Sequence, residues 1–81
     1  MKAYNNRGIV YAGRQQYDFA IEDFNKAIEL DPKNGEVYNN RAVAYWHKGE
    51  GARALQDIQK AQSLGIPVNP DMMKKIMGVA P

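Results

Sequence analysis

Few residues in this chain could do covalent chemistry. It has one serine, Ser63, and one histidine, His47, and it lacks cysteine and threonine altogether. An acyl-transfer enzyme needs a nucleophile, a general base and an orienting group within reach of one another. A zinc site needs three or four His, Cys or carboxylate ligands, and His47 alone does not supply them. We therefore expect no catalytic residue, no metal site, no cofactor and no small-molecule substrate.

Two further patterns resemble chemical sites but have simpler explanations. Gly8 and Gly13-Arg14 are spaced as in a phosphate-binding loop, yet the lysine and hydroxyl of such a loop are missing. The adjacent carboxylates Glu22-Asp23 fall within a predicted helix, where acidic side chains are mostly solvated. Neither pattern changes the expectation that the chain is not an enzyme.

Composition indicates one small globular domain. The 81 residues are 44% hydrophobic and 25% charged, which is typical of a soluble folded chain. The net charge of +2 is too small to favour nucleic acid or an anionic membrane as the partner. The sequence has neither an apolar run of membrane-spanning length nor the apolar core of a signal peptide. The compartment stays unknown, with the cytoplasm as the default.

The chain repeats itself at an interval of 34 residues. The string YNNRGIVY from Tyr4 to Tyr11 aligns with YNNRAVAY from Tyr38 to Tyr45. The same interval superposes Ala20, Asp23, Lys26, Ala27 and Leu30 on Ala54, Asp57, Lys60, Ala61 and Leu64. A fixed period in this range is typical of stacked repeat units.

Each unit is predicted to be two helices joined by a tight turn, because its apolar residues recur at helical spacing. Proline cannot continue a helix and Asn-Gly favours a turn, so Asp31-Pro32-Lys33-Asn34-Gly35 should separate the units. The predicted helices cover 2–14, 18–30, 36–48 and 52–64.

A fifth helix is predicted at 70–78. Asn69 suits the N-cap, Pro70 the first helical position, and Asp71 complements the helix dipole. The helix has too few polar residues to stand alone, so we expect it to cover the end of the second unit. Its apolar residues are Met72, Met73, Ile76 and Met77.

Charged residues at equivalent positions of the two units predict ion pairs. Facing positions of an antiparallel helix pair bring Arg7 near Asp23 and Arg41 near Asp57, with the arginine stems on Tyr4 and Tyr38. Within the second helix of each unit, opposite charges stand four residues apart, Glu22 with Lys26 and Arg53 with Asp57, which gives modest support to the helix.

The repeated unit resembles the tetratricopeptide repeat. The residues that carry the resemblance are Tyr4, Gly8, Tyr11, Ala20, Phe24, Ala27 and Pro32, followed by Tyr38, Ala42, Tyr45, Ala54, Ile58 and Ala61. Arg7 and Arg41 depart from the family's usual leucine, and Pro67 comes one place late. The resemblance implies an all-α fold of helix-turn-helix repeats stacked as a short right-handed superhelix. We expect one domain over 1–81, with repeats at 1–34 and 35–68 and a capping helix at 70–78, and we expect a fragment of a longer protein.

The resemblance also implies protein–protein recognition, in a concave groove lined by the first helix of each repeat. Such a groove holds an extended peptide or a partner helix. The expected groove residues are Lys2, Asn5, Ile9, Glu36, Asn39, Asn40, Val43, Trp46 and His47, with Ala12 and Gly13 beside them. Asn5 and Asn39 would either bond a peptide backbone or face water. In the subtype that grips chaperone C-termini, only Asn40 has a matching place, so that ligand is not predicted.

Trp46 and His47 are the expected hot spot of binding. The first repeat has Ala12 and Gly13 at these places, so the hairpin itself does not need bulk there, and tryptophan is enriched among residues that dominate binding. The alternative for Trp46 is packing beneath the fifth helix. Two alternatives for the whole chain are a structural segment that self-associates through its terminal helices, and helical-repeat RNA binding. The low charge and the 34-residue period argue against RNA.

Overall fold

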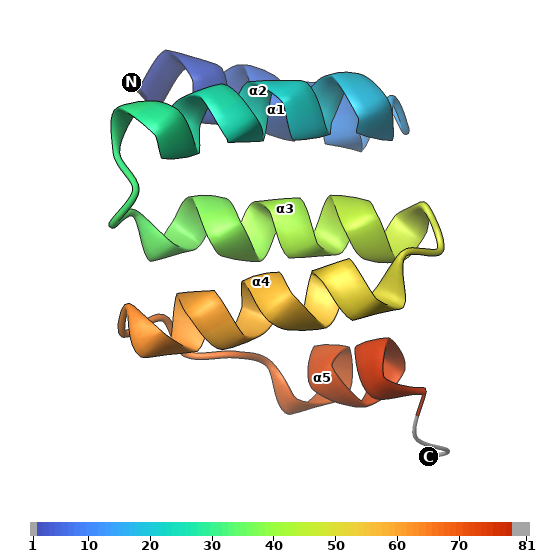
Figure 1. Ribbon diagram of the computed structural model, residues 1–81. Helices are drawn as coiled ribbons and strands as arrows, with labels where there is room; N and C mark the ends of the chain where they lie inside the picture. The colour runs from blue at the N-terminus through green and yellow to red at the C-terminus, as the bar shows by residue number, and fades with distance from the viewer. Residues whose placement is uncertain (1, 79–81) are drawn as a thin grey trace.

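A computed structural model describes residues 2–78 as five helices joined by short connections (Figure 1). They are α1 (Lys2–Gly13), α2 (Tyr17–Leu30), α3 (Gly35–His47), α4 (Gly51–Ser63) and α5 (Pro70–Met77), and no strand occurs among these residues. Every helix end lies within one residue of its predicted place. The all-α helical-repeat fold predicted from the sequence is confirmed. In the described part of the chain, each helix is too short or too polar to span a bilayer.

Helices that are neighbours along the chain are also neighbours in space. The pair α1 and α2 forms one hairpin, and the pair α3 and α4 forms another. Between them α2 packs on α3, and α5 lies against α4 at the far end of the stack (Figure 1). The first helices of the two hairpins, α1 and α3, also touch.

Local sequence fixes where the helices begin. The side-chain oxygen of Asn34 accepts from the backbone N–H of Glu36 at 3.2 Å, and that of Asn69 accepts from Asp71 at 2.8 Å. Each bond satisfies an amide that the first turn of a helix leaves without a partner. Asn69 is therefore the N-cap of α5, as its sequence predicted.

The core lies where large side chains of one helix meet small residues of the next. Phe24 of α2 lies against Gly8 of α1, and α4 contributes Ala54 and Ala61 with the fully buried Ile58. Close approach at small residues lets the hairpins reach interior packing density. The remaining buried apolar residues are Ala20, Ile21, Ala27, Val37, Ala42, Ala44, Tyr45 and Ile76.

The fifth helix extends this core beyond α4. Ile76 is 8% exposed, and Met72 and Met73 pack against the buried cluster. The side chain of Met77, also predicted to be part of this apolar set, lies outside the described residues. Burial of Ile76 leaves the polar side of the short helix to solvent.

The opposite charges that stand four residues apart in α2 and α4 pair with other residues in the structure. Lys26 lies 3.8 Å from Glu29 rather than beside Glu22. Arg53 lies 3.5 Å from Glu50, because Asp57 faces α3 and binds Arg41 instead. For Asp57, the partner on the facing helix is thus preferred to the residue four positions away on its own helix.

Candidate functional site

The residues expected to line a groove all lie on α1 and α3, the two helices that touch across the hairpins. We call them the α1–α3 face. Lys2, Glu36 and His47 are exposed, and Ile9 is 47% exposed. The half-buried members are Asn5, Asn39, Asn40, Val43 and Trp46.

A hydrogen bond between two asparagines joins the helices of this face. The amide nitrogen of Asn40 donates to the side-chain oxygen of Asn5 at 3.1 Å. The bond leaves the NH2 group of Asn5 and the side-chain oxygen of Asn40 available to a ligand. Asn39 sits beside Asn40 on α3, and no side-chain bond of Asn39 occurs within the described residues. The Asn5–Asn40 pair therefore keeps both a donor and an acceptor, and Asn39 is a further half-buried amide on α3.

Trp46 and His47 form an aromatic cluster with residues of two other helices. The ring of His47 stacks on Tyr17 of α2, with centroids 5.0 Å apart and planes 8° from parallel. Trp46 meets the edge of His47 at 4.9 Å, and the ammonium of Lys75 in α5 lies 5.9 Å from the Trp46 ring centroid. The sequence placed Trp46 and His47 side by side, but it gave no signal for Tyr17 or Lys75 as their neighbours.

In each hairpin, a buried aspartate of the second helix binds an arginine of the first helix. Both predicted ion pairs are thereby confirmed. Asp23 accepts from Nε and Nη2 of Arg7 at 2.7 and 2.8 Å, and Asp57 accepts from Nε and Nη2 of Arg41 at 2.8 and 2.7 Å. The guanidinium carbons lie 5.7 Å from the Tyr4 ring and 5.6 Å from the Tyr38 ring. Bidentate pairs of this kind are strong and fix geometry.

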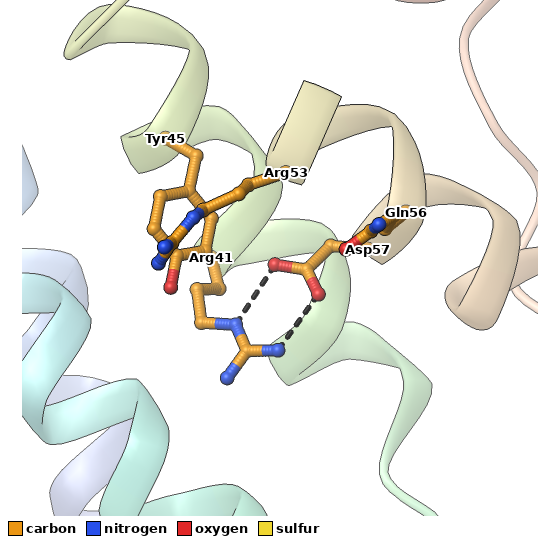
Figure 2. A pocket seen from close by; sticks show the side chains of 5 residues that line it. All are labelled: Arg41, Tyr45, Arg53, Gln56 and Asp57. Carbon is orange, nitrogen blue, oxygen red and sulfur yellow. Dashed lines mark hydrogen bonds and ion pairs between the residues drawn. The ribbon is translucent and has the colours of Figure 1, made fainter. Parts of the chain in front are cut away.

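The second pair lines a pocket between α3 and α4. Figure 2 shows Arg41 and Asp57 joined by two bonds, with Arg53 reaching over the ring of Tyr45. The guanidinium of Arg53 is 5.7 Å from that ring. The hydrogen bonds that Arg41 donates to Asp57 raise the pKa of Arg41, although partial burial opposes the shift. Asp23 likewise raises the pKa of Arg7, chiefly through its hydrogen bonds and then through its charge. Both arginines therefore stay charged. Arg41 already donates hydrogen bonds to Asp57 and Asn25.

A further ion pair links the hairpins beside His47. The ammonium of Lys48 lies 2.5 Å from Asp18 at the start of α2 and 3.4 Å from Glu50. Hydrogen bonding to Asp18 raises the pKa of Lys48. This contact was not predicted from the sequence, because it joins the turn of one repeat to the second helix of the other.

Within residues 2–78, no three His, Asp or Glu side chains gather closely enough to hold a metal ion. The α1–α3 face presents amide side chains, the exposed side chain of Ile9 and the half-buried ring of Trp46.

The chain was compared with models of known protein families and matches two of them. A tetratricopeptide repeat model matches residues 2–34, and a second tetratricopeptide repeat model matches residues 24–62. Comparison with curated proteins finds none that matches the chain. Tetratricopeptide repeats are non-catalytic scaffolds that generally mediate interactions between proteins. Two family matches across residues 2–62, together with the paired helices, show that this chain belongs to the tetratricopeptide repeat family.

Proposed function

We propose that the α1–α3 face binds an extended peptide or a partner helix of another protein. The observation that carries the proposal is the hydrogen-bonded pair of Asn5 and Asn40 where α1 meets α3. Asn40 and Asn5 hold each other in place at 3.1 Å while keeping further donors and acceptors free. A fixed amide pair loses little side-chain freedom when it binds a peptide backbone, and this preorganisation favours affinity.

Apolar contacts beside the amides support the same proposal. Ile9 is 47% exposed, and Val43 and Trp46 are half-buried on α3. A peptide lying along both helices would bond the asparagines through its backbone and bury its side chains against these residues. Lys2 and Glu36 carry opposite charges, so the face as a whole does not select strongly for the charge of its ligand.

The test begins with peptides selected from a random library displayed on phage. A selected peptide is titrated into the isotope-labelled protein, and the backbone amide resonances are followed by NMR. We expect the largest shifts at Ile9, Asn39 and Val43. The largest shifts on the outer side of α2 or α4 would contradict the proposal.

A matched pair of variants sharpens this test. Ile9→Glu and Leu30→Glu each place a carboxylate at an aliphatic residue of similar exposure, 47% and 52%. Only Ile9 belongs to the α1–α3 face. We expect Ile9→Glu to weaken the selected peptide about tenfold, since a buried charge in an interface costs more than 1 kcal/mol, and Leu30→Glu to leave it unchanged. Equal effects of the two variants would place the peptide elsewhere.

A further inference from the structure

Two helices begin with an asparagine cap, and the residue after each cap differs in its chemistry. Asn34 caps α3 and Asn69 caps α5, each through a side-chain oxygen that accepts from the backbone N–H two residues on. Gly35 follows Asn34, and Pro70 follows Asn69. The backbone nitrogen of Gly35 carries a hydrogen and has no Cβ beside it, whereas the nitrogen of Pro70 has no hydrogen to lose. Of the two caps, Asn34 alone therefore has a nucleophile next to its amide.

Asn34 is also the only asparagine of the chain that precedes a glycine. The others precede asparagine, arginine, lysine or proline. The N–H of Gly35 donates no hydrogen bond within residues 2–78, because the first turn of a helix has no carbonyl to offer it. Loss of the proton from this nitrogen therefore breaks no hydrogen bond of the fold.

Packing explains why this dipeptide stands between the repeats. A Cβ built on Gly35 would lie 2.5 Å from Cγ1 of Ile66 and 3.1 Å from Cβ of Leu64. A side chain at position 35 would therefore push α3 away from the connection that follows α4. Asn34 in turn supplies the oxygen that the first turn of α3 needs. Asn-Gly meets both needs of the fold at once.

We propose that Asn34 is a site of spontaneous deamidation and isomerisation. The Gly35 nitrogen gives its proton to water and bonds to Cγ of Asn34. The Cγ–Nδ2 bond breaks, and ammonia leaves with a proton taken from water. The product is a five-membered succinimide ring, formed without oxidation or reduction. Water then opens the ring at either carbonyl: opening at Cγ gives aspartate, and opening at the main-chain carbonyl gives isoaspartate, whose backbone runs through the side chain.

The first turn of α3 controls the rate of this reaction. Ring closure needs the Gly35 nitrogen to eclipse Cβ of Asn34, whereas the observed ψ of 95° turns that nitrogen to the opposite side from Cβ. The ring therefore closes after the cap bond to Glu36 has broken and the backbone of Asn34 has rotated. Loss of one cap bond is a local opening, which is far more frequent than unfolding of both hairpins. Asn34 is thereby reactive in the folded protein.

The isoaspartate product removes the cap. Its backbone is longer by one methylene, and its carboxylate is attached directly to Cα. The oxygen that caps Glu36 and the close contact of Gly35 with Ile66 are both displaced, so the first turn of α3 should fray. The aspartate product is milder, because an aspartate side chain also caps a helix.

The test is a time course of the 81-residue protein in mildly alkaline buffer, beside a synthetic peptide of residues 31–38. Mass spectrometry follows the exchange of amide for carboxylate at each asparagine, and labelling with an isoaspartyl methyltransferase reports the isomer. We expect isoaspartate at Asn34 and none at Asn69, formed about tenfold more slowly than in the peptide, as expected for the loss of one cap bond. A rate more than about a thousandfold below that of the peptide would mean that Asn34 reacts from the unfolded chain, and would overturn the proposal.

Two variants identify the reacting groups. Asn34→Ser keeps a capping oxygen and removes the amide, so its melting temperature should not fall as the protein ages, whereas that of the native protein should. Pro70→Gly gives Asn69 the nucleophile that it lacks, so isoaspartate should then form at Asn69 as well. Absence of isoaspartate at Asn69 in this variant, or equal ageing of Asn34→Ser and the native protein, would contradict the roles assigned to the two residues.

Discussion

Gly8 lies so close to Phe24 that a Cβ built on the glycine would be 2.5 Å from Cε1 of the ring. At the equivalent place of the second hairpin, Ala42 takes the position of Gly8 and Ile58 that of Phe24. In the first repeat the smallest residue meets a large ring, and in the second a slightly larger residue meets a smaller side chain, so the combined volume is similar. The match explains why a residue with poor helix propensity stands in the middle of α1.

The effect of Gly8→Ala on the free energy of unfolding should change sign with the residue at position 24. In the native protein, overpacking costs about 1–3 kcal/mol and outweighs the helix propensity of alanine, worth about 1 kcal/mol, so a net loss near 1 kcal/mol is expected. In a Phe24→Ile background the clash is gone, and Gly8→Ala should stabilise by about 1 kcal/mol. Thermal unfolding of the four proteins measures both effects. A loss of equal size in both backgrounds would show that the Phe24 ring is not the obstacle.

The two ion pairs should differ in their contribution to stability. Arg41 also binds Asn25 and its side chain is 20% exposed, whereas the side chain of Arg7 is 60% exposed. Arg41→Ala leaves buried Asp57 without a partner and should cost about 3 kcal/mol in urea unfolding. Arg7→Ala should cost less, because water replaces much of the lost interaction. Replacing Arg41 and Asp57 together by Met and Leu should recover most of the loss, since no unpaired charge remains.

Arg53→Ala serves as the control for that series. Arg53 lies over the ring of Tyr45 and near Glu50, but its side chain is 64% exposed. We expect less than about 1 kcal/mol, as for an exposed pair. Equal losses for Arg53 and Arg41 would mean that the pocket of Figure 2 owes its stability to the aromatic contact and not to Asp57.

Trp46→Ala should separate binding from folding. The ring is half-buried, with His47 at its edge and Lys75 above it. If Trp46 dominates binding on the α1–α3 face, its removal costs about 2 kcal/mol, or about thirtyfold in affinity, for a selected peptide. Trp46→Phe should recover part of the loss. A large fall in melting temperature with unchanged affinity would instead assign Trp46 to the contact with α5.

The turn between α1 and α2 contains a residue under backbone strain. Gln15 has φ of 62°, and the equivalent residue of the second hairpin is Gly49 with φ of 84°. A left-handed conformation costs a residue with a side chain about 1–2 kcal/mol, while glycine adds about 0.5–1 kcal/mol of entropy loss on folding. Gln15→Gly should therefore raise stability by about 0.5–1 kcal/mol, or about 4 °C in melting temperature.

Gly49→Gln is the reciprocal variant. It imposes on the second turn the strain that Gln15 imposes on the first, so a loss of about 1 kcal/mol is expected in thermal unfolding. No atom lies within 4 Å of a Cβ built on Gly49, so the loss would come from the backbone and not from a clash. A neutral result for both variants would show that these turns adjust freely to the side chain.

The sequence predicted what is local or repeated. Helix ends follow from Pro32, Asn34 and Asn69, which act within a few residues of themselves. The Arg7–Asp23 and Arg41–Asp57 pairs follow from the geometry of a single hairpin, which the helical period defines.

Contacts between repeats were harder to predict. The Asn5–Asn40 bond, the His47–Tyr17 stack and the Lys48–Asp18 pair depend on how one hairpin is rotated against the other. The periodicity of the sequence predicts the helices of each repeat, but it does not predict the angle between the two hairpins. The groove residues came from the family resemblance, and their role in binding stays a prediction.

The order of helices in Figure 1 has a consequence for how the chain folds. Because each helix packs chiefly on the next one along the sequence, most contacts between helices form without the closure of a long loop. Topologies of this kind have low contact order and fold in roughly microseconds to milliseconds. Either hairpin can serve as the nucleus, and the remaining helices can then add one at a time. The same order makes the outermost helix, α5, the first to detach under mild denaturant, ahead of the two hairpins beneath it.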